Sequence, residues 1–218
     1  MSQLIDRYNR NLNYLRISIT DRCNLRCRYC VPLTPMTMLT HTEILRYEEI
    51  LRFVKIGVQH GITKVRVTGG EPLVRKGVIS FLHTLSEFEE LEDISITTNG
   101  LLLKENIDNL KSAGIKRLNI SLDSLDRENF KKISGMDQFS KVWDGIMAAL
   151  DSGFAPIKIN VVALNDFNRH ELIDFAELSL RYPFSVRFIE YMPIGRSPLD
   201  AQKGLLTPDI KEIISPLG

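Results

Sequence analysis

The sequence predicts an α/β fold in which six β/α units form an incomplete parallel barrel, open on one side. Three observations lead to this prediction. Short runs rich in β-branched residues alternate with longer amphipathic runs. The expected strands are apolar on one face and polar on the other. All three cysteines of the chain follow the first expected strand directly, at the end of the barrel where active sites of such folds lie.

The alternation defines each expected element. The helical run 41–61 has Ile50 and Val54 on one face and ends at Gly61, a suitable C-cap. The segment 124–138 shows no regular pattern and is expected to be irregular. The expected strands are 15–20, 64–68, 93–98, 117–123, 157–164 and 185–192, and the other expected helices are 75–88, 104–113, 138–152 and 169–181.

The faces of the strands decide between two parallel architectures. In the first strand, Ile17 lies opposite Arg16 and Ser18, and four further strands alternate in the same way. A doubly wound sheet is covered by helices on both faces, so its strands should be apolar throughout. A complete eight-stranded barrel fills its interior with apolar side chains. A wider, incomplete barrel with a polar, ligand-holding interior therefore fits the pattern best.

Composition excludes several classes of protein. The chain has 218 residues and a formal net charge of +1, which gives no reason to expect a nucleic-acid or membrane partner. No apolar run approaches membrane-spanning length, and residues 1–11 do not resemble a signal peptide. We therefore expect a cytoplasmic protein whose thiols stay reduced.

The cysteines are the most informative feature. Cys23, Cys27 and Cys30 have the spacing C-x3-C-x2-C, and no fourth cysteine follows. Closed structural zinc sites and ordinary iron–sulfur sites use four protein ligands. Three alternatives stay open: a zinc site completed by a distant residue such as His41, three thiols without metal, and a cluster completed by another protein. The favoured interpretation is a four-iron cluster with one iron open for a reacting ligand.

These residues also carry a resemblance. The segment "CNLRCRYC" resembles the C-x3-C-x-aromatic-C signature of the radical S-adenosylmethionine (SAM) superfamily. Beyond it, the segments "LRISITDRCNLRCRYC", "VRVTGGEPLVRKG", "ITTNGLLL", "RLNISLDSLD", "IKINVVAL" and "VRFIEYMPIG" are similar, in order, to the GTP 3′,8-cyclases (the MoaA family).

The resemblance implies a fold, an activity and two cofactors. The fold would be a partial (β/α)6 TIM-like barrel of the radical SAM type, open on one side. A [4Fe-4S] cluster would cleave SAM reductively to a 5′-deoxyadenosyl radical. This lyase reaction would convert GTP to (8S)-3′,8-cyclo-7,8-dihydroguanosine 5′-triphosphate in molybdenum cofactor biosynthesis. An electron donor would be a partner, and a homodimer is left open.

The resemblance also implies roles for individual residues, although it assigns no side chain as a catalytic group. Glycines let the backbone approach a ligand, and a carboxylate pairs with an ammonium group, whereas "GG" alone is more often a plain turn. The implied cluster ligands are Cys23, Cys27 and Cys30; the SAM contacts are Tyr29, Gly69, Gly70, Glu71, Ser121 and Met192; and the GTP contacts are Arg16, Arg66, Thr97 and Lys158.

The charges of the expected interior support an anion site. Arg16, Arg66 and Lys158 come from strands one, two and five, on their polar faces. Two like charges ~8 Å apart at an effective dielectric constant of 20 repel by roughly 2 kcal/mol. A triphosphate would offset this repulsion, and arginine binds phosphate with its planar fork. The alternative is that each cation pairs with a carboxylate such as Asp123 or Glu190.

One departure from the family is large. The cyclases continue into a C-terminal region with a second three-cysteine cluster that holds the purine, whereas this chain has no cysteine after Cys30. We expect residues 1–218 to form one radical SAM core domain, with 204–218 as the start of that further region. The alternatives are a catalytically incomplete fragment, a radical SAM enzyme for a peptide or another nucleotide, and a thiolate–metal electron carrier.

Overall fold

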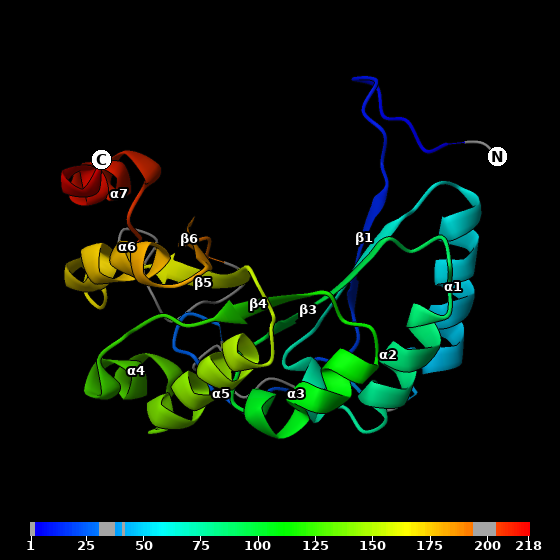
Figure 1. Ribbon diagram of the computed structural model, residues 1–218, viewed down its shortest axis with the longest axis horizontal. Helices are drawn as coiled ribbons and strands as arrows, with labels where there is room; N and C mark the ends of the chain where they lie inside the picture. The colour runs from blue at the N-terminus through cyan, green and yellow to red at the C-terminus, as the bar shows by residue number, and fades with distance from the viewer. Residues whose placement is uncertain (1–2, 31–37, 41, 194–203) are drawn as a thin grey trace. The chain divides into compact units, whose positions relative to one another are not determined.

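The computed structural model describes residues 3–30, 38–40, 42–193 and 204–218 (Figure 1). Strands and helices alternate along the chain, as the sequence predicts. The elements are β1 (Tyr14–Ser18), α1 (Tyr47–Gln59), β2 (Lys64–Thr68), η1 (Pro72–Val74), α2 (Val78–Ser86), β3 (Asp93–Thr98), α3 (Leu103–Ser112), β4 (Arg117–Ser121), α4 (Arg127–Ser134), α5 (Phe139–Asp151), β5 (Ile157–Ala163), η2 (Arg169–Glu171), α6 (Leu172–Arg181), β6 (Phe184–Glu190), α7 (Thr207–Ile214) and η4 (Ser215–Leu217).

The strands form one sheet in the order β1-β2-β3-β4-β5-β6. The pairs β1–β2, β2–β3, β4–β5 and β5–β6 are all parallel. A doubly wound sheet reverses its strand order at a switch point, whereas this order runs in one direction from first strand to last. A strand order without reversal is that of a barrel, so the expected open (β/α)6 fold is confirmed.

The described residues fall into two compact units. The first comprises Met1–Cys23, Met38–Thr98 and Glu105–Leu118. In it, α1 and α2 cover one side of β1 and β2 (Figure 1). The core between helices and strands contains Val54 of α1 with Val65 and Val67 of β2, each completely buried. These are the apolar strand positions that the alternation predicts.

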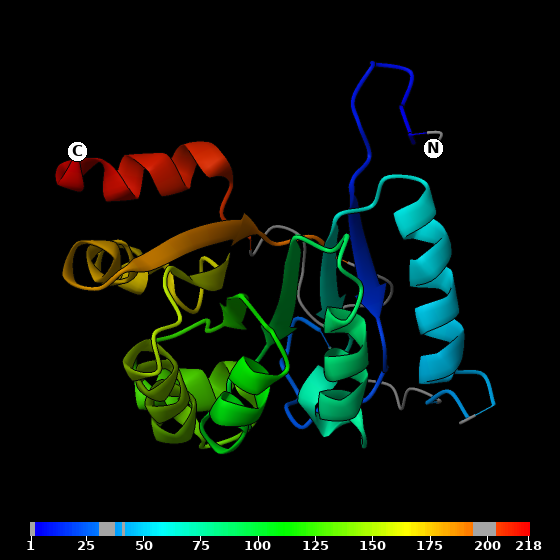
Figure 2. The ribbon, with the colours of Figure 1, turned by 45° about the vertical axis from the view of Figure 1, so that its right-hand side comes forward.

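The second unit comprises Asn24–Thr37, Asn99–Lys104 and Asn119–Gly218. Helix α6 lies beside β6, and α7 packs on α6 (Figure 2). In β5, Ile157, Ile159 and Val161 are buried, while the residues between them are partly exposed. An apolar cluster joins the end of β5 to both helices; it contains Ala163, Leu172, Leu205 and Ile210.

Two helices were not expected from the sequence. The segment 124–138 was expected to be irregular, and this expectation is wrong because residues 127–134 form α4. The Asp126 carboxylate caps this helix by accepting a hydrogen bond from Asn129 N at 2.7 Å. Gly135 ends it with φ +75°. Only two apolar side chains of α4, Phe130 and Ile133, are buried, so its periodicity is too weak to recognise. The second unexpected helix is α7.

Within the described parts of the chain, no helix combines the length and the apolar character that crossing a bilayer requires.

Candidate functional site

The three cysteines lie on the loop that follows β1. Cys23 belongs to the first compact unit, and Cys27 and Cys30 belong to the second. Cys23 and Cys30 are exposed and Cys27 is half-buried, so the loop is accessible to a cofactor. Cys30 N donates a hydrogen bond to Cys27 O at 2.9 Å, which closes a turn between these two ligand candidates. His41, the alternative zinc ligand, lies outside the described residues.

The described geometry does not by itself assemble a metal centre. No three His, Cys, Asp or Glu side chains of the described ranges are gathered closely enough to hold an ion. The chemistry of the donor set nevertheless fits an iron–sulfur cluster, since three thiolates within eight positions are soft ligands on an accessible loop. The ligand roles of Cys23, Cys27 and Cys30 stay predictions.

Tyr29 connects the cysteine loop to the end of β4. Its hydroxyl donates a hydrogen bond of 2.6 Å to the carboxylate of Asp123. Burial raises the pKa of Asp123 to about 6, although the hydrogen bonds from Tyr29 and Val162 N act against this rise. Burial, and then the negative charge of Asp123, raise the pKa of Tyr29 well above its usual value. At neutral pH the pair is therefore a neutral phenol donating to a carboxylate.

The glycine segment after β2 packs directly on the backbone that leads into the cysteine loop. Gly70 N donates to Thr20 O at 2.7 Å, and Glu71 N donates to Arg22 O at 2.8 Å. A Cβ atom added at Gly70 would lie only 2.4 Å from Arg22 O. Glycine is required at position 70 because the two backbone segments leave no space for a side chain.

We expect Gly70→Ala to destabilise the first unit by about 1–3 kcal/mol, since the added methyl group meets backbone atoms and the backbone must shift. Urea unfolding of the apoprotein measures this change. Gly153→Ala measures the cost of backbone strain without a steric clash, because its φ is +87° and no atom lies within 4 Å of an added Cβ atom there. If Gly70→Ala were no less stable than wild type, the close approach would be contradicted.

Glu71 occupies a different environment from the one expected for an ammonium-binding carboxylate. It is completely buried. Its Oε1 accepts hydrogen bonds from Thr98 Oγ1 at 2.8 Å and from Leu73 N at 3.0 Å. In this structure the Glu71 side chain caps η1 and bonds to the end of β3. Its contact with SAM stays a prediction, as do those of Gly69 and Gly70.

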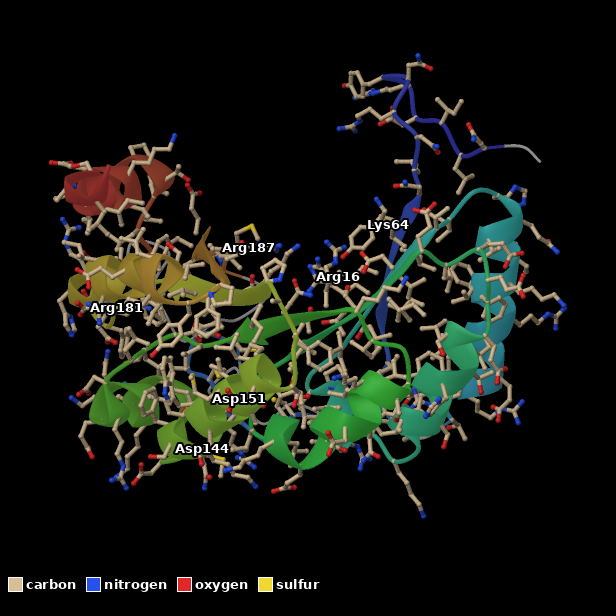
Figure 3. The ribbon with its side chains drawn as sticks, in the orientation of Figure 1. Arg16, Lys64, Asp144, Asp151, Arg181 and Arg187 are labelled. Atoms are coloured by element: carbon tan, nitrogen blue, oxygen red, sulfur yellow. The ribbon has the colours of Figure 1, made fainter. Side chains whose placement is uncertain are left out.

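Three polar residues line up across the first three strands. Arg16 of β1 is the register partner of Arg66 of β2, and Arg66 is the partner of Ser95 of β3. Side chains at partner positions of parallel strands lie on the same face of the sheet, about 4.8 Å apart in the hydrogen-bonding direction. Arg16 lies on the side of β1 away from α1 (Figure 3). Thr97 follows Ser95 by two positions and so lies on the same face.

This row contains buried polar atoms that lack partners. Arg66 Nε, Ser95 Oγ and Thr97 Oγ1 are buried and make no hydrogen bond in the described structure. A buried polar group left without a hydrogen bond costs about 1–3 kcal/mol. Three such atoms on neighbouring strands indicate a place where a polar ligand completes the bonding. Ser95 was not identified from the sequence because a single serine carries no signal without its register partner.

The alternative in which carboxylates neutralise these cations has no support in the first unit. Among the described residues, no carboxylate forms an ion pair with Arg16 or Arg66. Arg66 instead lies over the Tyr14 ring, with 5.4 Å from Cζ to the ring centroid. Glu190, one of the two candidate partners, accepts a hydrogen bond from Thr207 N at 2.7 Å.

The second unit carries two polar rows of its own. Lys158 of β5 is the partner of Asn119 and Ser185. Two positions on, Asn160 is the partner of Ser121 and of Arg187. Arg187, which projects from β6 in Figure 3, was not identified from the sequence; its position in the alternation of β6 is the signal that could have found it. Met192 follows β6 and is 68% exposed.

The comparisons with known sequences agree with this arrangement. The model of the Radical SAM superfamily matches residues 17–179. Two similar proteins are named GTP 3′,8-cyclase. That of Petrotoga mobilis is 52% identical over 196 residues, which is 90% of this chain and 61% of the relative. That of Thermodesulfovibrio yellowstonii is 49% identical over 210 residues, covering 96% and 65%. The chain thus spans less than two thirds of the length of these curated relatives.

Solved structures share the fold at low sequence identity. Streptococcus suis SuiB bound to S-adenosylmethionine has a TM-score of 0.75 and 19% identity, with 94% of this chain and 46% of that chain covered. Methylornithine synthase (PylB) has a TM-score of 0.67 and 18% identity, covering 93% and 62%. The family model spans more than half of the chain and includes the cysteine loop, the glycine segment and the strands β2 to β5. The chain therefore belongs to the radical SAM superfamily.

Proposed function

We propose that this chain is the radical SAM core of a GTP 3′,8-cyclase, which converts GTP to (8S)-3′,8-cyclo-7,8-dihydroguanosine 5′-triphosphate for molybdenum cofactor biosynthesis. Relatives of about 50% identity with this name support the reaction. The observation that supports an anionic substrate is the polar row of Arg16, Arg66 and Ser95, in which Arg66 Nε and Ser95 Oγ are buried without a hydrogen bond.

Cys23, Cys27 and Cys30 would hold a [4Fe-4S] cluster, and superfamily members use such a cluster with SAM. When bound, the cluster supplies the electron for reductive cleavage of SAM. The chain's own part is to hold and orient the ligands. Gly69 and Gly70 allow their backbone to pack directly on the segment that precedes Cys23. Ser121, Tyr29 and Met192 are the further SAM contacts in this proposal.

The proposed triphosphate site uses charge and hydrogen-bond donors together. Arg16 and Arg66 are neighbours on β1 and β2, so an anion bound between them would offset the repulsion of two like charges. The hydroxyls of Ser95 and Thr97 would donate to phosphate or ribose oxygens. Lys158 of β5, in the second unit, is the remaining predicted GTP contact. An external electron donor and a cytoplasmic, reducing location complete the proposal.

Reductive cleavage of SAM tests the first part of this function. The reconstituted and reduced wild-type protein should release 5′-deoxyadenosine, because the proposed SAM contacts all lie within residues 29–192. The measurement is chromatographic analysis of anaerobic reactions with dithionite. Release of no 5′-deoxyadenosine by protein with an intact cluster would contradict the radical SAM role of this chain.

A second candidate is a radical SAM enzyme for another anionic nucleotide. It is favoured by the same row, because Arg16 and Arg66 would bind any polyphosphate and no residue of the row reads a base. A peptide substrate would leave the row without a ligand. Comparison of GTP, ATP and guanosine as ligands separates these possibilities.

A further inference from the structure

Asp123 is the residue at which the cysteine loop contacts the end of β4. The residue is 7% exposed. Oδ2 accepts the hydrogen bond from the Tyr29 hydroxyl at 2.6 Å, and Oδ1 accepts one from Val162 N at 2.8 Å. The two oxygens thus join the loop that bears Cys27 and Cys30 to β5. A distance of 2.6 Å is typical of a hydrogen bond from a hydroxyl group to an ionised carboxylate.

The backbone at Asp123 is fixed by a buried asparagine. Asn168 is completely buried. Its Nδ2 donates to Asp123 O at 2.7 Å and to Val162 O at 2.8 Å, while its Oδ1 accepts from Leu164 N at 2.8 Å. One amide therefore ties the end of β4 to the end of β5. It therefore fixes the backbone of Asp123 relative to Val162, whose N–H group bonds to the Asp123 carboxylate.

The segment after Asp123 is held in the same way by a buried carboxylate. Glu171 is 4% exposed. Its oxygens accept hydrogen bonds from Ser124 Oγ at 2.9 Å and from Asp126 N at 3.2 Å. A buried carboxylate destabilises the fold unless hydrogen-bond donors surround it. Loss of these bonds would therefore be unfavourable, and they hold the segment in place. Hydrogen bonds therefore hold both the backbone of Asp123 and the segment that follows it.

The loop itself is fixed at its backbone by α4. Arg26 N donates to Ser134 O at 3.0 Å, and Arg28 N donates to Ile133 O at 2.9 Å. These bonds hold the main chain on the N-terminal side of Tyr29. They do not set the rotation of its aromatic ring about χ1 and χ2. The hydrogen bond from the hydroxyl to Asp123 does so, because it fixes the far end of the ring.

We propose that Asp123 is a positioning residue for SAM: its anchored carboxylate fixes the Tyr29 ring and the turn from Cys27 to Cys30 before the ligand binds. This inference rests on the proposed function, in which Tyr29 contacts SAM. Fixing a side chain in advance removes the entropy cost of ordering it on binding, so a ring without this bond gives weaker affinity.

The experiment compares Tyr29→Phe, Asp123→Ala, Asp123→Asn and the double variant Tyr29→Phe/Asp123→Ala. Asp137→Asn is the matched control, since Asp137 lies just after α4 and its carboxylate pairs with Arg127 at 2.8 Å. One measurement is the SAM dissociation constant of the reconstituted protein. The other is amide hydrogen exchange of residues 24–30 in the apoprotein, which needs neither cluster nor SAM.

Tyr29→Phe and Asp123→Ala should each weaken SAM binding by about two- to ten-fold, the effect of having to order one side chain on binding. The double variant should be no weaker than Asp123→Ala, since both changes remove the same bond. Asp123→Asn should restore part of the affinity, because its amide oxygen can accept from Val162 N–H while its NH2 group donates to the Tyr29 hydroxyl. The amide of Cys30, which closes the turn after Tyr29, should exchange faster in Tyr29→Phe, whereas the amide of Arg28, held by Ile133 O, and the rest of the second unit should be unchanged.

Multiplicative losses in the double variant, or loop exchange no faster in Tyr29→Phe than in Asp137→Asn, would overturn the positioning role. A uniform acceleration across the second unit would also overturn it, because that is the result of general destabilisation. If the wild type bound no SAM at all, the proposed function would fail, and the exchange measurement alone would then decide whether Asp123 fixes the loop.

Discussion

Cys27→Ala is expected to abolish assembly of the iron–sulfur cluster and, with it, release of 5′-deoxyadenosine from SAM. Wild-type protein reconstituted under anaerobic conditions should contain about four iron and four sulfide per chain, as three thiolates suffice for a cluster with one open iron. Cys27→Ala leaves two thiolates, which do not retain the cluster. Iron and sulfide analysis with Mössbauer spectroscopy measures the change.

Arg28→Ala is the matched control for this prediction. Arg28 is exposed on the same loop, and its backbone N–H donates to Ile133 O, so alanine keeps both the bond and the three thiols. This variant should hold as much iron as wild type. Stoichiometric zinc in the wild type, with no uptake of iron in the absence of oxygen, would contradict the cluster and favour the zinc site.

Arg66→Ala is expected to weaken the binding of GTP and of ATP alike, by about ten-fold or more, because each hydrogen bond to a charged group contributes roughly 1.5–3 kcal/mol. Guanosine, which lacks phosphates, should bind poorly to wild type and variant. The change should not lower the stability of the apoprotein by much, since it removes a buried Nε without a partner and a cation beside Arg16. Anaerobic calorimetric titration and urea unfolding measure the two effects.

Arg52→Ala serves as the control for charge alone, because Arg52 is an exposed residue of α1 in the same compact unit. It should leave the affinity for both triphosphates unchanged.

Thr97→Val tests the row independently, since valine keeps the shape of threonine and removes the unpartnered hydroxyl. Equal affinity of the wild type for guanosine and GTP, or indifference to Arg66→Ala, would remove the phosphate site.

Much of the fold follows from local patterns of the sequence. Alternation at period two in β2 and β5 predicted which residues are buried, and β2 and β3 have the predicted bounds. The position of Cys23, Cys27 and Cys30 after β1 followed from the same patterns. So did the polar strand positions of Arg16 and Arg66 in the first unit and of Lys158 in the second. Each of these features depends on residues a few positions apart, and the geometry of one strand or one loop is enough to place them.

The tertiary structure decided the contacts that join distant segments. Tyr29 and Asp123 are 94 positions apart, and no local pattern connects a phenol to a carboxylate at that separation. Ser95 was recognised only through its register partner Arg66 on the neighbouring strand. The burial of Glu71 and the anchoring of Asp123 by Asn168 and Glu171 likewise depend on which loops meet. Helix α4 escaped notice because only Phe130 and Ile133 of its apolar side chains are buried, so its stability depends on tertiary packing rather than on a periodic apolar face.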